Sequence, residues 1–344
     1  MKKLLLGLFC CLSAGLPAVE HGGQLTFWHR ETTAGQPNQL GVRYLPDFFW
    51  DKPLPFLTDA DIALNIYNFT GGEQDWKFYR FWTRYTAEQW EVRVGLQKIN
   101  FGSATLFRPL QWFDTIDPLD PLGFTESVKG LLVRYYLPNN ANFWLWGLYG
   151  NEELKGSEII PTKKQDLEFG GRLQLPLFNG EAGLTYHQRR LDFGRSPTFS
   201  ILSDEIAPER RVGLDGKWDL GLGVWLEAAK IEQETASAEQ MPKEQFLTTI
   251  GADYTFAIGN GLHILLEKFN QDSPAEKYNR QMYGLLIDYP LDLYDKLICL
   301  RQFNADGGVS QLSWQRVYDD LVLQVSVAQQ EKNNSWQVNA TYNY

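Results

Sequence analysis

The chain has 344 residues, a net charge of −10 and 14% aromatic residues, yet its mean hydropathy is only −0.33. The acidic charge argues against nucleic acid as a partner. Beyond residue 18, no stretch approaches the roughly 18 apolar residues that a spanning helix needs, which excludes a helical membrane protein.

The first 18 residues predict a cleavable export signal. Lys2 and Lys3 form its charged start, an apolar run follows, and small residues lead to a cleavage site after Ala18, with Gly15 as the alternative. The apolar run is too short to span a bilayer. We therefore predict a signal peptide at residues 1–18 and one domain at residues 19–344.

The mature chain repeats one pattern, in which two alternating segments are joined by a short turn and followed by a longer polar loop. In the last segment, Trp336, Val338 and Tyr342 share one face, whereas Gln337 and Asn339 lie on the other. A period of two predicts β-strands. Because the apolar face recurs with aromatic residues at its ends, we predict a transmembrane antiparallel β-barrel of about 18 strands, with 16 as the alternative.

Turn residues divide these strands into hairpins. Short turns are predicted at residues 86–89, 138–142, 178–181, 219–223, 259–261, 290–294 and 318–320. Longer loops are predicted at residues 100–127, 150–165, 193–209, 232–244 and 270–279. Such alternation indicates a periplasmic face of short turns and an outer face of long loops.

Two segments resemble a known family. Arg93, Gly95, Gln97 and Gly102 follow the pattern R-x-G-x-Q-x-x-x-x-G, which resembles a strand of large porin-like outer-membrane barrels of Gram-negative bacteria, including alginate-export-type barrels. The terminal Tyr344 resembles the signal read by the barrel-assembly machinery. The resemblance implies an outer-membrane location, contact with lipid and a transport function. It leaves the solute and an association into homotrimers open.

The face opposite the apolar one must line the lumen. On the second to tenth strands, the predicted lumen positions include Arg43, Arg80, Arg84, Arg93, Arg134, Arg172, Arg189 and Arg211. Guanidinium groups bind carboxylates through paired hydrogen bonds, so this arginine ladder would offer anionic solutes several weak sites. The alternative is that the arginines pair with lumen acids and stiffen the wall. Later strands contribute further acids, namely Glu227, Asp253, Glu267 and Asp288.

The segment at residues 100–127 is the longest one without alternation. It is rich in apolar residues that a surface loop would leave exposed. We predict that it folds into the lumen as a constriction, with its aspartates facing the arginine ladder; a surface lid or an oligomer contact is the alternative. Its candidate site residues are Arg108, Trp112, Asp114, Asp117 and Asp120.

Together these features favour a porin, a passive channel for small hydrophilic solutes with a bias toward anions. An export channel for an acidic polysaccharide would need a lumen without a loop plug. An outer-membrane enzyme would need a catalytic pair, but His187 and His263 lie far apart in the sequence without a well-placed serine. No clustered spacing indicates a metal, so we predict no catalysis and no cofactor. A soluble secreted binding protein would not require detergent.

Overall fold

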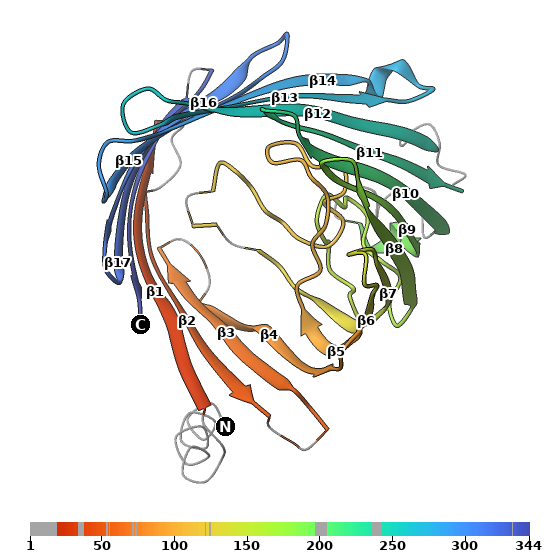
Figure 1. Ribbon diagram of the computed structural model, residues 1–344. Coiled ribbons are helices and arrows are strands. Elements are labelled where there is room, and N and C mark those ends of the chain that lie inside the picture. The colour runs from red at the N-terminus through yellow and green to blue at the C-terminus, as the bar shows by residue number, and fades with distance from the viewer. Residues whose placement is uncertain are drawn as a thin grey trace.

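The computed structural model describes residues 19–33, 38–52, 54, 56–70, 72, 74–120, 122–123, 125–196, 205–234, 242–331 and 333–344. The predicted signal peptide at residues 1–18 lies outside them. Within the described residues, 18 antiparallel strands form one closed sheet (Figure 1). The prediction of an all-β barrel of about 18 strands is therefore confirmed. No helix in this part of the chain has the length and apolar character needed to cross a membrane.

Each strand pairs with its neighbours in sequence, and the sheet closes where the first strand pairs with the last. The strands are β1 (Val19–Thr32), β2 (Gln39–Asp51), β3 (Asp59–Phe69), β4 (Asp75–Thr86), β5 (Trp90–Gln97), β6 (Val128–Tyr136), β7 (Asn142–Tyr149), β8 (Leu167–Leu177), β9 (Gly180–Asp192), β10 (Ile206–Asp219), β11 (Gly223–Gln233), β12 (Glu244–Phe256), β13 (Leu262–Asp272), β14 (Arg280–Pro290), β15 (Asp295–Phe303), β16 (Gly308–Tyr318), β17 (Leu321–Gln330) and β18 (Asn333–Asn343). Short 3-10 turns lie at Phe193–Arg195 and Glu276–Tyr278.

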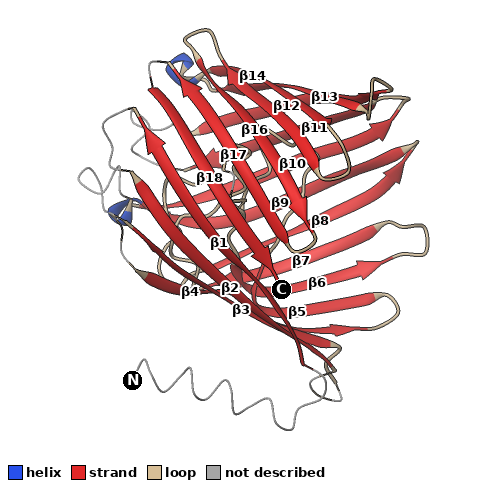
Figure 2. Ribbon diagram, turned by 90° about the vertical axis from the view of Figure 1, so that its left-hand side faces the viewer, coloured by secondary structure: helices blue, strands red, loops and turns tan. Residues whose placement is uncertain are grey.

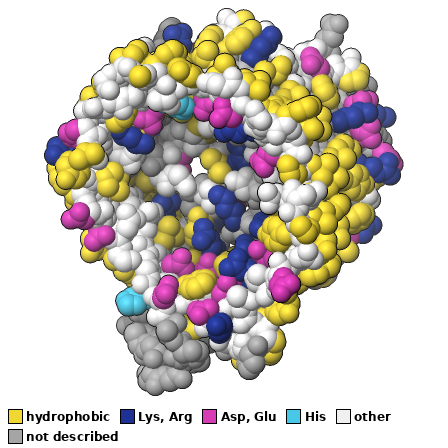
Figure 3. Space-filling model, in the orientation of Figure 1, with side chains coloured by type: hydrophobic (Ala, Val, Ile, Leu, Met, Phe, Trp, Pro, Cys, Tyr) yellow, Lys and Arg dark blue, Asp and Glu magenta, His cyan; other side chains and the backbone are white. Residues whose placement is uncertain are grey.

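The alternation of side chains along each strand separates an outer from an inner face. On β9, Thr185 and His187 are fully buried inside the barrel, whereas Leu184 and Tyr186 are exposed on its outside. The same period carries exposed apolar side chains around the outer wall, and Figure 3 shows them gathered on its flank. An apolar exterior around a polar interior is the pattern of a barrel that crosses a membrane.

The connections differ at the two ends of the barrel (Figure 2). At the short-turn end, brief connections such as residues 178–179 and 319–320 join the strands. At the long-loop end lie the connections at residues 98–127 and 150–166. The start of β1 lies at the short-turn end beside the chain terminus, because Gly23 N donates to Tyr344 O at 3.1 Å.

The connection between β5 and β6, residues 98–127, lies inside the barrel (Figure 1). We call it the constriction loop. Its side chains Ile99, Phe101, Trp112 and Phe113 form one buried cluster with Trp146 and others from the wall. Burial of these apolar groups explains why the loop turns inward rather than into water. The predicted inward fold is thereby confirmed.

The connection between β7 and β8, residues 150–166, also enters the barrel, although the sequence pattern placed it among the outer loops. We call it the second loop. Its residues Lys155, Glu158 and Thr162 are buried, and Ser157 N donates to Gln111 O of the constriction loop at 3.0 Å. The expectation of a surface loop was wrong because its charged side chains have partners on the inner wall.

Candidate functional site

The constriction loop leaves β5 through the residues of the R-x-G-x-Q-x-x-x-x-G pattern. Gly95 and Gly102 have φ angles of +124° and +99°, a region that favours glycine. A side chain at Gly102 would overlap the carboxylate of Glu227. The buried Gln97 donates from Nε2 to Gly130 O at 3.1 Å on β6. The pattern therefore shapes the departure of the loop from the wall.

Two buried carboxylates on the opposite wall hold the loop backbone. Glu227 on β11 accepts hydrogen bonds from Ser103 N (2.9 Å), Ala104 N (2.9 Å) and Leu110 N (2.5 Å). Glu267 on β13 accepts three further backbone N–H groups, at 2.6–2.8 Å, from residues 105–107. Since buried N–H groups must find acceptors, these acids act as anchors. The sequence analysis found both at lumen positions but not this role.

Apolar contacts seat the loop between the anchors. Leu106 and Phe107 pack against Trp225 and Leu300 of the wall. Phe101 stacks on Trp146 with ring centroids 5.7 Å apart. The loop is thus fixed to both sides of the barrel and narrows the space between them.

The predicted site residues of the loop divide between its interior and its surface. Arg108 Nη1 donates to Asp114 Oδ1 at 3.1 Å, and Asp114 is only 1% exposed. Trp112 is buried as well. The expectation that Asp114 faces the arginine ladder was therefore wrong, because its charge is satisfied by Arg108 within the loop itself. Asp117 and Asp120 instead line a cavity of about 590 Å³.

That cavity lies between the loop tip and the inner wall of β16–β18 and β1. Its wall is formed mainly by amide and hydroxyl side chains, among them Gln311, Ser326 and Gln337. Arg43 on neighbouring β2 donates from Nη2 to Leu122 O at 3.0 Å, which ties the loop tip to the wall. Arg43 therefore takes part in positioning the loop.

Four arginines of the ladder gather on the inner wall of β4–β6. Arg84 binds Asp59, Arg80 lies 3.8 Å from Asp61, and Arg93 and Arg134 lie 3.2 and 3.5 Å from Glu91. The arginine side chains keep 15–35% of their surface exposed, whereas the three carboxylates keep only 6–9%. The surface that this wall presents to the lumen is accordingly guanidinium, with the carboxylates behind it.

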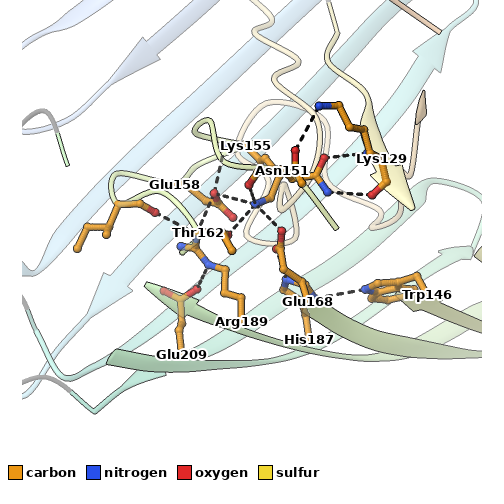
Figure 4. Close-up of polar contacts among 12 residues, drawn as sticks. Lys129, Trp146, Asn151, Lys155, Glu158, Thr162, Glu168, His187, Arg189 and Glu209 are labelled. Atoms are coloured by element: carbon orange, nitrogen blue, oxygen red, sulfur yellow. Dashed lines mark hydrogen bonds and ion pairs between the residues drawn. The ribbon is translucent and has the colours of Figure 1, made fainter. Parts of the chain in front are cut away.

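The remaining three ladder arginines are buried in ion pairs. Arg189 and Arg211 also line a cavity of about 550 Å³ within the barrel. Arg172 donates to Asp215 at 2.5 and 2.9 Å. Arg189 contacts Glu158 at 2.9 Å and Glu209 at 2.6 Å, as Figure 4 shows. Arg211 shares both carboxylates, at 3.3 and 2.7 Å. The contacts of Glu158 with Arg189 and Arg211 fix the second loop to β9 and β10, whereas Arg172 and Asp215 join β8 to β10.

The second loop also supplies a lysine to the wall (Figure 4). Lys155 Nζ lies 3.1 Å from Glu168 on β8, and the other oxygen of Glu168 lies 3.3 Å from His187 Nε2. Trp146 Nε1 donates to His187 Nδ1 at 3.3 Å. This histidine therefore serves a structural network and has no open face toward a solute.

Water-accessible space remains on both sides of the inward loops. A cavity of about 550 Å³ opens beside Arg108 and the second loop, and one of about 810 Å³ opens near Glu181, Lys217 and His263 at the short-turn end. Figure 3 shows the hollow centre with charged side chains on its wall. Among the described residues, no cluster of His, Cys, Asp and Glu could hold a metal ion.

No protein-family model and no curated protein matches the chain by sequence. Solved structures do match its fold. OccK2 (OpdF) of Pseudomonas aeruginosa aligns with a TM-score of 0.65 at 10% identity, over 94% of this chain and 96% of that one. A mutant porin of Rh. blastica aligns with a TM-score of 0.53 at 10% identity, over 95% and 100%.

A third match has a different printed role. Wzi of Escherichia coli, described as a carbohydrate-binding β-barrel involved in group 1 capsule assembly, aligns with a TM-score of 0.59 at 13% identity, over 99% of this chain and 87% of that one. All of these identities are low, so the likeness concerns the fold. The chain thus has the antiparallel barrel fold of the outer-membrane porins.

Proposed function

We propose that this protein is an outer-membrane porin, a passive and non-enzymatic channel for small hydrophilic solutes that favours anions. The observation that carries the proposal is the constriction loop, held inside a polar barrel by Glu227 and Glu267. A barrel narrowed but not filled by such a loop admits small solutes and excludes large ones.

The anion preference rests on the wall formed by Arg80, Arg84, Arg93 and Arg134. Their guanidinium groups are more exposed than the carboxylates that they contact. An anion that passes through the lumen therefore contacts the guanidinium groups before it comes near the negatively charged carboxylates. Several weak sites in a row attract the ion without trapping it.

A channel for an acidic polysaccharide is a weaker candidate. That function requires a lumen wide enough for a polymer chain and free of a plug. The constriction loop and the second loop both occupy the lumen. The fold likeness to the carbohydrate-binding Wzi is shared with a porin of Rh. blastica and does not separate the two functions.

The test is conductance in a planar lipid bilayer. Under a salt gradient, the reversal potential of the wild-type channel should indicate anion preference. Neutralising Arg80, Arg84 and Arg93 to glutamine should abolish most of that preference. Arg190→Gln is the matched control, because Arg190 binds Asp166 on the outer face. Unchanged selectivity would remove the arginine wall from the proposal, and absence of any conductance would overturn the channel itself.

We further propose that residues 1–18 direct export and that the terminal strand guides assembly into the outer membrane. Tyr344 donates its hydroxyl to Tyr44 at 2.8 Å, across the closing seam of the barrel. Deletion of Tyr344 should lower the amount of protein recovered in the outer-membrane fraction, with Tyr318→Ala as the control. Light scattering of the detergent-solubilised protein would test whether three copies associate into a homotrimer.

A further inference from the structure

An apolar groove of about 590 Å³ crosses the outer face of β11–β15, which are consecutive in the sheet; β11–β14 can be followed side by side in Figure 1. Two rows of paired residues enclose it. One row is Val224, Ala252, Leu266 and Leu285, and the next residue of this row, Arg301 on β15, stands just past the lining of the groove. The other row is Leu226, Ile250, Lys268, Tyr283 and Phe303.

The groove rises from one end of the barrel toward the other. Val224 lies next to the short-turn end of β11, whereas Arg301 lies near the long-loop end of β15. Four strand spacings make the groove about 19 Å long. One leaflet contributes about 15 Å to the hydrocarbon core of a bilayer. The groove is therefore long enough for part of an acyl chain, because about half of its length, from β11 to β13, lies on the apolar side of Lys268.

Two cations stand beside the upper half of the groove, Lys268 on its middle strand β13 and Arg301 on its last strand β15. Lys268 Nζ lies 5.8 Å from the ring centroid of Tyr283, and Arg301 Cζ lies 5.1 Å from that of Phe303. These two rings stack on each other with centroids 5.5 Å apart. The aromatic pair thus lies beside both cations in the upper half of the groove, next to the apolar floor on β11–β13, as interfacial aromatic residues of such barrels do.

These two cations differ from their neighbours on the outer face. Arg210 lies 3.3 Å from Glu234, and Lys230 lies 2.7 Å from Glu232 and 3.0 Å from Glu244. Within the described part of the chain, neither Lys268 nor Arg301 has a carboxylate at ion-pairing distance; their contacts are with aromatic rings. Their charge is therefore available to an external anion.

We propose that this groove binds an acyl lipid whose phosphate headgroup carries a net negative charge. One acyl chain lies along Leu266, Ile250 and Ala252, and the phosphate lies between Lys268 and Arg301. Guanidinium and ammonium groups both bind phosphate, the first through paired hydrogen bonds. The site requires the proposed membrane location but not solute conduction, because it lies on the other side of the wall from the lumen.

The test compares two lipids with identical chains. Purified, delipidated protein in detergent is titrated with dimyristoyl phosphatidylglycerol or dimyristoyl phosphatidylcholine, and bound lipid is counted by native mass spectrometry. The wild type should prefer the anionic lipid. Lys268→Gln with Arg301→Gln should weaken its binding about 30-fold, since each basic group near a membrane surface contributes about fivefold. That change corresponds to about 2 kcal/mol.

Arg210→Gln with Lys230→Gln is the matched control and should leave lipid binding unchanged, because those charges already have carboxylate partners. Ala252→Trp, which fills the groove but keeps both cations, should weaken the binding of both lipids. Equal affinity of the wild type for both lipids would overturn the proposal, as would an unchanged preference in the Lys268/Arg301 variant. Bilayer conductance measured on the same samples separates this outcome from failure of the channel.

Discussion

Replacing Glu267 with glutamine should release the constriction loop from the wall. The Glu267 carboxylate accepts Thr105 N (2.6 Å) and Trp225 Nε1 (2.9 Å) at one oxygen. At its other oxygen it accepts Leu106 N and Phe107 N, both at 2.8 Å. Glutamine has the same shape, but one of the two terminal groups of its side chain is an NH₂ group. That group would face the N–H donors and cannot accept their hydrogen bonds.

In either orientation the glutamine loses two of these hydrogen bonds to a charged acceptor. Each is worth about 1.5–3 kcal/mol, so the docking of the loop should weaken by about 3–6 kcal/mol. The anchor is 3% exposed, so water does not replace the lost partner. We expect a larger and noisier single-channel conductance and new protease cleavage after Arg108. Glu181→Gln, at the exposed short-turn end, is the control.

The reasoning would be refuted if the Glu267→Gln barrel kept wild-type conductance and protease resistance while remaining folded. Foldedness can be followed separately through the slower migration of the heated protein on gels. That control separates release of the loop from collapse of the barrel.

Three further predictions follow from the same contacts. Gly102→Ala should destabilise the docked loop because of its φ of +99°, whereas Gly147→Ala, at an uncrowded strand position, should be nearly neutral in denaturant unfolding. In Glu158→Gln, the buried Arg189 and Arg211 lose a carboxylate partner. The free energy of unfolding should fall by about 3–5 kcal/mol, measured as a lower unfolding midpoint. In the turn after β14, N–H groups of Tyr294 and the next residue hold the pKa of Asp292 below its usual value. The stability that ionised Asp292 gives the turn is therefore present above about pH 3.9 and is lost as the pH falls through the lowered pKa. Hydrogen exchange of the turn should accordingly become faster in acid in the wild type but not in Asp292→Asn.

The outer face of the barrel could be predicted from the sequence because a period of two requires only local information. The exposed Trp336, Val338 and Tyr342 on β18 follow directly from their spacing. The inward position of the constriction loop was also predictable, since Trp112 and Phe113 need a place to be buried.

The partners of the lumen charges could not be predicted. Arg189 and Arg211 have the strand parity of pore-lining residues, but Glu158 reaches them from a loop whose inward path no local pattern reveals. Likewise, Glu227 and Glu267 have the parity of selectivity groups, and their role as anchors depends on backbone N–H groups more than 100 residues earlier in the chain. The periodicity of a strand therefore predicts which face of the sheet a side chain lies on, but not which loop residues contact it there.

The distance in sequence between the constriction loop and its anchors has a consequence for biogenesis. Residues 103–110 are synthesised long before Glu227 and Glu267, with separations of 117–162 positions. The backbone N–H groups of these residues lack their carboxylate acceptors until β11 and β13 have joined the sheet. Docking of the loop to these two anchors must therefore be a late event in the folding of the chain. Variants at the two glutamates should consequently slow maturation of the pore without slowing the first appearance of the barrel.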